Sequence, residues 1–153
     1  MPLTSLETMD SQRDVGMVLF EEVVIPSDPA EARCVQDQIE QLLQDRRVNG
    51  HDIFSIKLAL EEALINAIKH GNQLDRNKKI RVSYRVLHDR FEVRIRDEGP
   101  GFDPADVPDP TAIENLERPC GRGLMLMRHY MTEVAYGDGG SSVIMSKVFR
   151  PKK

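Results

Sequence analysis

With 153 residues, of which 40% are hydrophobic and 30% charged, the chain has the size of one folded domain, and its composition argues against disorder. The net charge of −4 gives no surplus of Lys and Arg for nucleic-acid phosphates, and no apolar run approaches the about 20 residues that span a bilayer. Because the N-terminus also lacks the basic-then-apolar order of a signal peptide, we expect a cytoplasmic protein with proteins or small molecules as partners, and with no direct contact to nucleic acid or membrane.

The N-terminal segment, residues 1–15, is polar and without periodicity, and we expect it to form a flexible arm. Residues 16–153 are then expected to form a single domain. The first strand of this domain is predicted over 17–25. The two cysteines, Cys34 and Cys120, are isolated in the sequence and predict reduced thiols, since they are too few for a disulfide framework.

Two helices are predicted next. The first begins with Asp28 as the capping residue and Pro29 at the first helical position, and Glu31 stands where a capping box needs it. The second helix is predicted over 52–70. Its apolar side chains fall close to one line at about 100° per residue, and they are Ile53, Ile56, Leu60, Leu64 and Ala67.

The rest of the chain combines strands with one long loop and one short helix. Alternation and flanking turns predict four strands, over 80–87, 91–97, 133–136 and 142–149. Residues 98–119 are rich in Gly, Pro and Asp and long for a plain loop, which favours a functional lid. A helix is expected from about Gly121. This order of elements predicts an α+β fold, a two-layer sandwich with helices on one face of a mixed, mostly antiparallel sheet.

A polar row on the second predicted helix, formed by Glu62, Asn66 and Lys69, is turned away from the apolar line. A solvated helix face would explain such a row. Three apolar residues flank it on the same side: Phe54, Leu58 and Ile65. They favour the wall of a half-apolar pocket, in which the carboxylate could accept a proton and the carboxamide could offer an oxygen to a hard cation.

Two glycine-containing segments follow the polar row. Asp97 comes directly after a predicted strand, and Gly99 and Gly101 allow a sharp turn beside a ligand whose exocyclic amine Asp97 could bind. An ordinary tight turn is the alternative. Residues 121–123 read Gly-Arg-Gly at the start of a predicted helix, where free N–H groups and the helix dipole suit a phosphate. An ordinary helix start explains this segment equally well.

In their order and spacing, the stretches EEALINAIKHGN, RDEGPGFDP and RPCGRGLMLMRHYMTEV resemble the N, G1 and G2 boxes of the ATPase fold shared by gyrase, heat-shock chaperones and histidine kinases. Within that superfamily they look most like the small anti-sigma-factor serine/threonine kinases. The resemblance covers roughly residues 17–149. It implies ATP and Mg²⁺ as cofactors, a sigma factor as one partner, and a small antagonist protein of the STAS type as the substrate that is phosphorylated.

The resemblance also implies roles for individual residues. Glu62 matches the catalytic base, Asn66 the Mg²⁺ ligand, and Asp97 the aspartate that reads adenine. Arg118 is the candidate for the γ-phosphate contact and counts with Glu62 as catalytic. The residues implied to bind the nucleotide are Asn66, His70, Asp97, Gly99, Gly101, Gly121, Arg122, Gly123, Leu124, Ser141 and Ser142, where either serine could replace the family's threonine beside adenine.

Other functions remain to be weighed against this one. A non-catalytic module that binds ATP and sequesters a partner is the main alternative, and the same chain could do both. A self-contained histidine kinase is disfavoured because residues 1–50 contain no histidine. A chaperone-type ATPase fits poorly, because such proteins carry further domains. The resemblance also suggests a possible homodimer.

Overall fold

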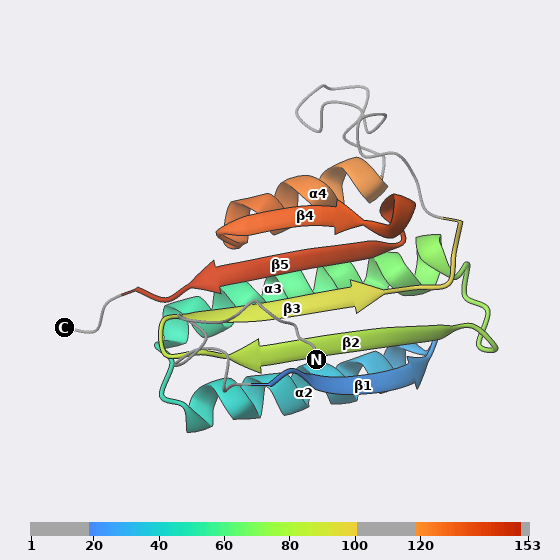
Figure 1. Cartoon of the computed structure of the whole chain (residues 1–153). Coiled ribbons are helices and arrows are strands. Elements are labelled where there is room, and N and C mark those ends of the chain that lie inside the picture. Colours follow the sequence, from blue (N-terminus) through green and yellow to red (C-terminus); the bar gives the residue numbers. More distant parts are fainter. Residues whose placement is uncertain (1–18, 101–118, 151–153) are drawn as a thin grey trace.

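The computed structural model describes residues 19–100 and 119–150 of the chain. The predicted arm, residues 1–15, and most of the predicted lid lie outside the described residues. The described part forms two layers, a sheet and a set of helices (Figure 1).

One five-stranded sheet forms the first layer, with the strand order β1-β2-β3-β5-β4. Its strands are β1 Glu21–Pro26, β2 Lys79–Val86, β3 Arg90–Arg96, β4 Glu133–Gly137 and β5 Ser142–Val148. All four pairings between neighbouring strands in this sheet are antiparallel. In β2 and β3 buried and less buried residues alternate along the strand, as expected for a sheet that buries one face.

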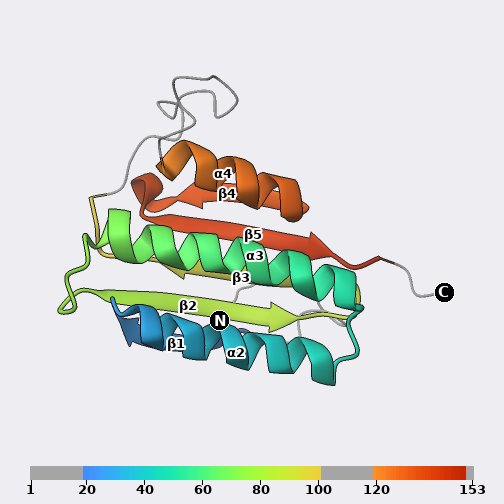
Figure 2. The same cartoon turned by 180° about the vertical axis from the view of Figure 1, so that it is seen from behind.

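The helices α2 Pro29–Asp45, α3 Gly50–Asn66 and α4 Pro119–Tyr130 cover one face of this sheet, as the two opposite views show (Figures 1 and 2). The α+β sandwich predicted from the order of elements is therefore confirmed. The helix predicted from about Gly121 begins two residues earlier, at Pro119, which is a residue favoured in the first turn of a helix.

Side chains cap the first two helices. Asp28 Oδ1 accepts a hydrogen bond from Ala30 N–H at 2.9 Å, and Asn49 Oδ1 accepts one from Asp52 N–H at 2.9 Å. The predicted capping box at α2 is wrong, because Asp28 N–H donates to Pro26 O and is not available to Glu31. The Asp28 N–H is instead used in the tight turn that follows β1.

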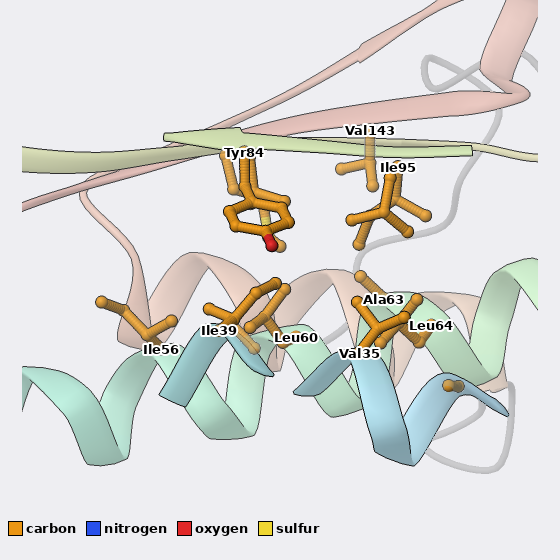
Figure 3. Close-up of a cluster of buried hydrophobic side chains, with 14 of the residues drawn as sticks. Val35, Ile39, Ile56, Leu60, Ala63, Leu64, Tyr84, Ile95 and Val143 are labelled. Atoms are coloured by element: carbon orange, nitrogen blue, oxygen red, sulfur yellow. The ribbon is translucent and has the colours of Figure 1, made fainter. Parts of the chain in front are cut away.

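The hydrophobic core lies between the two layers (Figure 3). All five apolar residues predicted to line the buried side of the second helix are buried. They meet the inward-facing side chains of the central strands, among them Tyr84, Ile95 and Val143. Burying each large aliphatic side chain contributes about 1.5–3 kcal/mol, so this contact fixes α3 against the sheet.

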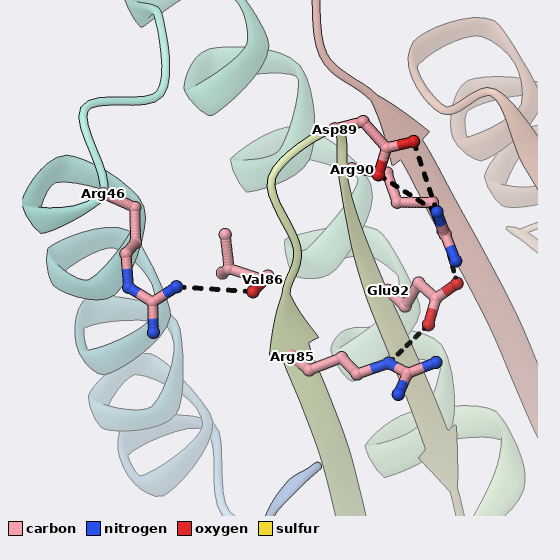
Figure 4. Close-up of polar contacts among 6 residues, drawn as sticks. All are labelled: Arg46, Arg85, Val86, Asp89, Arg90 and Glu92. Carbon is pink, nitrogen blue, oxygen red and sulfur yellow. Dashed lines mark hydrogen bonds and ion pairs between the residues drawn. The ribbon is translucent and has the colours of Figure 1, made fainter. Parts of the chain in front are cut away.

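An ion-pair network braces the β2–β3 hairpin at one end of the domain (Figure 4). Glu92 accepts hydrogen bonds from Arg85 Nε and Arg90 Nε, both at 2.7 Å. Burial alone would raise the pKa of the Glu92 carboxyl, but the hydrogen bonds from the two arginines outweigh it and hold that pKa below its usual value. These ion pairs join β2 to β3 near the hairpin turn, whereas Asp97 directly follows the other end of β3.

Among the residues that the structure describes, no helix combines the length and the apolar character needed to cross a membrane.

Candidate functional site

The last turn of the second helix is wider than the sequence predicts. α3 ends at Asn66, and Ala67–Gly71 forms a π-helical turn, in place of a regular helix to His70. Asn72 N–H donates to Ala67 O at 2.8 Å, a bond that spans five residues as in a π-helix. Such single turns occur frequently at functional sites, and this one brings the end of the helix beside the turn that follows β3.

The helix end and the turn after β3 touch through two glycines. A side chain on Gly71 would run into the carboxylate of Asp97, and a side chain on Gly99 would run into the backbone carbonyl of Gly71. Both glycines are therefore required by close approach, not by an unusual backbone angle. The two segments that the sequence singled out separately form one packed unit.

A pocket of about 170 Å³ lies beside this unit. It is lined by Ala63, Asn66, Ala67, His70, Gly71, Ile95, Asp97, Met127, Tyr136, Gly140, Ser141, Ser142 and Val143. Five of the residues predicted to bind a nucleotide thus share one pocket: Asn66, His70, Asp97, Ser141 and Ser142. Mostly apolar walls with few polar groups are typical of sites for small molecules.

Asp97 is the acidic residue of the described pocket lining. Its Oδ1 accepts a hydrogen bond from Gly99 N–H at 2.7 Å, and its own N–H donates to Ser141 O at 2.8 Å. Burial raises the pKa of the Asp97 carboxyl, and the Gly99 hydrogen bond and the charge of Lys78 offset this only in part. The carboxylate is held in place with acceptor capacity left for a ligand donor.

This raised pKa predicts how the Asp97→Asn variant differs in stability from the natural protein. The native state binds the Asp97 proton more tightly than the unfolded state, so the contribution of Asp97 to the free energy of unfolding falls as the pH rises above the ordinary value of 3.8. The loss is complete above the folded-state pKa, and the amide variant does not suffer it. We expect urea unfolding between pH 4 and 7 to show the variant gaining stability relative to the natural chain as pH rises. If the stability of the variant relative to the natural chain stayed constant or fell as the pH rose, the Asp97 carboxylate would not be destabilised by burial.

Two arginines hold the turn on the far side of the pocket. Asp138 Oδ2 accepts hydrogen bonds from Arg94 at 2.9 Å and from Arg96 at 3.1 Å. Ser141 Oγ donates to Asp138 O at 2.9 Å. The turn between β4 and β5, which carries Gly140 and Ser141 into the pocket, is thus fixed to β3, the strand that also delivers Asp97.

The polar row of α3 is partly buried, contrary to a fully solvated helix face. Asn66 lines the pocket, and its Oδ1 is buried without a hydrogen-bond partner, although a buried acceptor ordinarily finds one. Glu62 lies one turn earlier on the helix and is half-buried, while Lys69 is exposed. No group of three or more His, Cys, Asp or Glu within the described ranges is arranged to hold a metal ion. The unpartnered Oδ1 makes Asn66 a candidate ligand at this pocket.

Among the described side chains predicted to bind the nucleotide, Leu124 is not part of the pocket lining. Leu124 of α4 is 6% exposed, and its contact with a nucleotide stays a prediction. Gly121, Arg122 and Gly123 lie in the first turns of α4. Arg118 and Gly101 lie outside the described residues.

Several lining residues were missed by sequence reasoning. Tyr136 and Val143 come from adjacent strands and Met127 comes from α4. The sequence predicts the first two only as strand residues and the third only as part of a helix. Their pairing across β4 and β5 and against α4 is a tertiary property with no local signal. Gly71 was noted in the sequence as part of the polar-row segment, but its contact with Asp97 could not be read from it.

Comparisons with known proteins show which family and relatives the chain resembles. The family described as histidine kinase-like ATPase domain matches residues 25–147. A serine-protein kinase RsbW from Listeria monocytogenes is 33% identical over 111 residues, which are 66% of this chain and 69% of the relative. The RsbW of Bacillus subtilis is 28% identical over 133 residues, which are 82% of this chain and 83% of the relative.

A solved structure shares the fold. The crystal structure of the RsbU and RsbW domains of a Mycobacterium tuberculosis protein matches with a TM-score of 0.60 and 19% sequence identity over 86% of this chain. This chain spans about a third of the length of that protein's chain, since the match covers 33% of it. With the pocket between α3, α4 and the β4–β5 turn, and with residues 25–147 matched, the chain belongs to the family of histidine kinase-like ATPase domains and is similar to the serine-protein kinases named RsbW.

Proposed function

We propose that this protein is an ATP-dependent serine/threonine protein kinase that acts as an anti-sigma factor, binding a sigma factor and phosphorylating a small antagonist protein. The main support for the proposal is that Asp97 and Asn66 line one pocket. The close contact of Gly71 with Asp97 and Gly99 brings the two segments together. The relatives named serine-protein kinase RsbW support the choice of reaction.

The pocket suits an adenine base. A purine is flat and apolar on its faces, and Ile95, Met127 and Tyr136 offer apolar lining for them. The edge of adenine carries an exocyclic amine, which could donate to the half-buried Asp97 carboxylate. Hydrogen bonds to a charged acceptor contribute about 1.5–3 kcal/mol, so this contact would dominate recognition of the base.

The chain fits a magnesium ion at Asn66. An amide oxygen that is buried and without a partner is the kind of hard ligand that Mg²⁺ accepts, together with phosphate oxygens and water. When bound, the ion would neutralise the charge of the triphosphate. The start of α4, with Gly121, Arg122 and Gly123, would offer backbone N–H groups to the phosphates, and Arg118 is proposed to contact the terminal one.

Glu62 is the proposed catalytic base. It stands four residues before Asn66 on the same face of α3, so a hydroxyl group brought to the phosphate end of the pocket would lie within its reach. Its carboxylate would orient the attacking serine or threonine and take its proton. Phosphoryl transfer needs little other covalent help from the protein.

The test of this function is a phosphotransfer assay. Purified protein incubated with Mg-ATP and a small STAS-type antagonist protein from the same genome should yield phosphoserine or phosphothreonine on the antagonist, detected by mass spectrometry. Binding of a sigma factor is measured in parallel by pull-down. Tight partner binding with no transfer under any condition would favour the non-catalytic sequestering module.

A further inference from the structure

Asn72 is a polar residue that none of the roles above uses, although it is 0% exposed. It directly follows the π-helical turn, and it lies where the end of α3, the end of β1, the start of β2 and the turn after β3 come together. A buried carboxamide that lacks partners is costly, so the contacts of Asn72 show what it holds.

The two ends of the Asn72 carboxamide bind different parts of the fold. Nδ2 donates to Ser27 Oγ at 2.7 Å and to Lys79 O at 3.0 Å. Ser27 Oγ in turn donates to Lys78 O at 2.7 Å. On the other side, Asn72 Oδ1 accepts a hydrogen bond from Glu98 N–H at 2.7 Å. One end therefore fastens Asn72 to the strands, and the other fastens it to the turn.

The bond to Glu98 acts on the pocket residue beside it. The Glu98 amide is part of the peptide group that joins it to Asp97, and Asp97 Oδ1 accepts the N–H of Gly99, the residue after Glu98. Fixing the Glu98 N–H thus fixes the plane of the peptide group between Asp97 and Glu98. This plane contains the Asp97 Cα, from which the carboxylate side chain extends. The contacts of Gly71 with Asp97 and Gly99 limit the turn from the other side.

We propose that Asn72 is a positioning residue that sets the orientation of the Asp97 carboxylate, and through it the preference of the pocket for a purine that carries an exocyclic amine. The inference rests on the proposed function, because it assumes that Asp97 receives the adenine amine. Asn72 does not line the pocket and acts only through the turn.

The hydrogen bonds of Asn72 allow a positioning role to be distinguished from a merely structural one, because Ser27 and Glu98 can be uncoupled by mutation. Ser27 is 2% exposed and belongs to the strand side of the same network, so Ser27→Ala removes a buried hydrogen bond without touching Glu98. Asn72→Ala removes both sides. A structural role predicts that the two variants behave alike, whereas a positioning role predicts that only Asn72→Ala changes the choice of ligand.

The experiment is calorimetric titration of each protein with Mg-ATP and with the triphosphate of purine riboside, which lacks the exocyclic amine. The natural chain and Ser27→Ala are expected to prefer ATP by about tenfold or more, the value of one hydrogen bond to a charged acceptor. Asn72→Ala is expected to bind both ligands within about threefold of each other. Both variants should melt at lower temperature than the natural chain.

The outcomes distinguish a failure of the proposed function from a failure of the positioning role of Asn72. If the natural chain binds neither ligand, the proposed function fails. If it prefers ATP and folded Asn72→Ala keeps that preference in full, the positioning role is overturned. Should Asn72→Ala not fold, Asn72→Asp decides, because its carboxyl oxygen can still accept the Glu98 N–H. If Asn72→Asp protects the Glu98 amide from hydrogen exchange and still prefers ATP, the positioning role is supported. If it protects that amide but loses the preference for ATP, the positioning role is rejected.

Discussion

Replacing Glu62 with alanine is expected to reduce phosphoryl transfer by about 10²–10⁴-fold, the usual contribution of a positioned general base, while the affinity for ATP stays nearly unchanged. The reason is its place in the fold. Glu62 is half-buried on α3, one turn before Asn66, but it is absent from the lining of the pocket proposed to hold the base. Initial rates of antagonist phosphorylation and calorimetric titration with ATP measure the two quantities separately.

The neighbouring glutamate provides a matched control. Glu61 is on the same helix and exposed, so Glu61→Ala removes the same charge from α3 without removing the proposed base. We expect its rate of transfer to stay within about threefold of the natural chain, since a surface substitution of this kind perturbs little. Equal losses in both variants, or a Glu62→Ala variant that loses ATP binding instead of transfer, would rule out Glu62 as the base.

A second large effect is expected from Gly71→Ala, which should weaken ATP binding by about 100-fold, as expected when a hydrogen bond to a charged acceptor is lost. The added methyl group would occupy the space of the Asp97 carboxylate, so either the carboxylate or the π-helical turn must move. Calorimetric titration with Mg-ATP gives the affinity, and thermal unfolding shows whether the variant remains folded.

Gly50→Ala is the control for this variant. Gly50 is the first residue of α3, and a methyl group added there meets nothing within 4 Å. Alanine is also the better helix former, so Gly50→Ala should bind ATP like the natural chain and be equally or more stable. If Gly71→Ala binds ATP as tightly as Gly50→Ala, then the close packing of the helix end against Asp97 is not what forms the site.

The sequence was sufficient to predict most of the secondary structure, because its signals are local. Asp28 followed by Pro29 marks the start of α2, and this start is confirmed by the cap that Asp28 forms with Ala30. The alternation in 80–87 and 91–97 follows from a sheet that buries one face, and the two strands pair as a hairpin. Such patterns depend on periodicity alone.

The end of α3 could not be predicted in the same way. A regular helix and a π-helical turn have nearly the same composition, and the choice at Ala67–Gly71 depends on packing against the turn after β3. Only the absence of a side chain at Gly71 and Gly99 allows that packing. The sequence shows two glycines at separate places, and their contact is a property of the tertiary structure.

The candidate site was predicted in part. Asn66 and Asp97 were singled out from motifs, and Ser141 and Ser142 from the family resemblance, and the structure brings all four to one pocket. Tyr136 and Met127 were not singled out, because a strand residue and a helix residue that face a pocket have the same local pattern as core residues. The polar row illustrates the same limit: the sequence left a solvated face open for Asn66, whose Oδ1 is buried.

Calorimetric titration of Mg-ATP into the natural chain and into Asp97→Asn tests the central claim most directly. An adenine held by the Asp97 carboxylate requires that the natural chain bind ATP with measurable heat, and that the variant bind about 10- to 100-fold more weakly because a charged acceptor is lost. Asparagine keeps the size of the side chain and an oxygen for Gly99 N–H, so the fold should survive. Absence of binding by the natural chain, or equal affinity in both proteins, would contradict the assignment of this pocket to ATP.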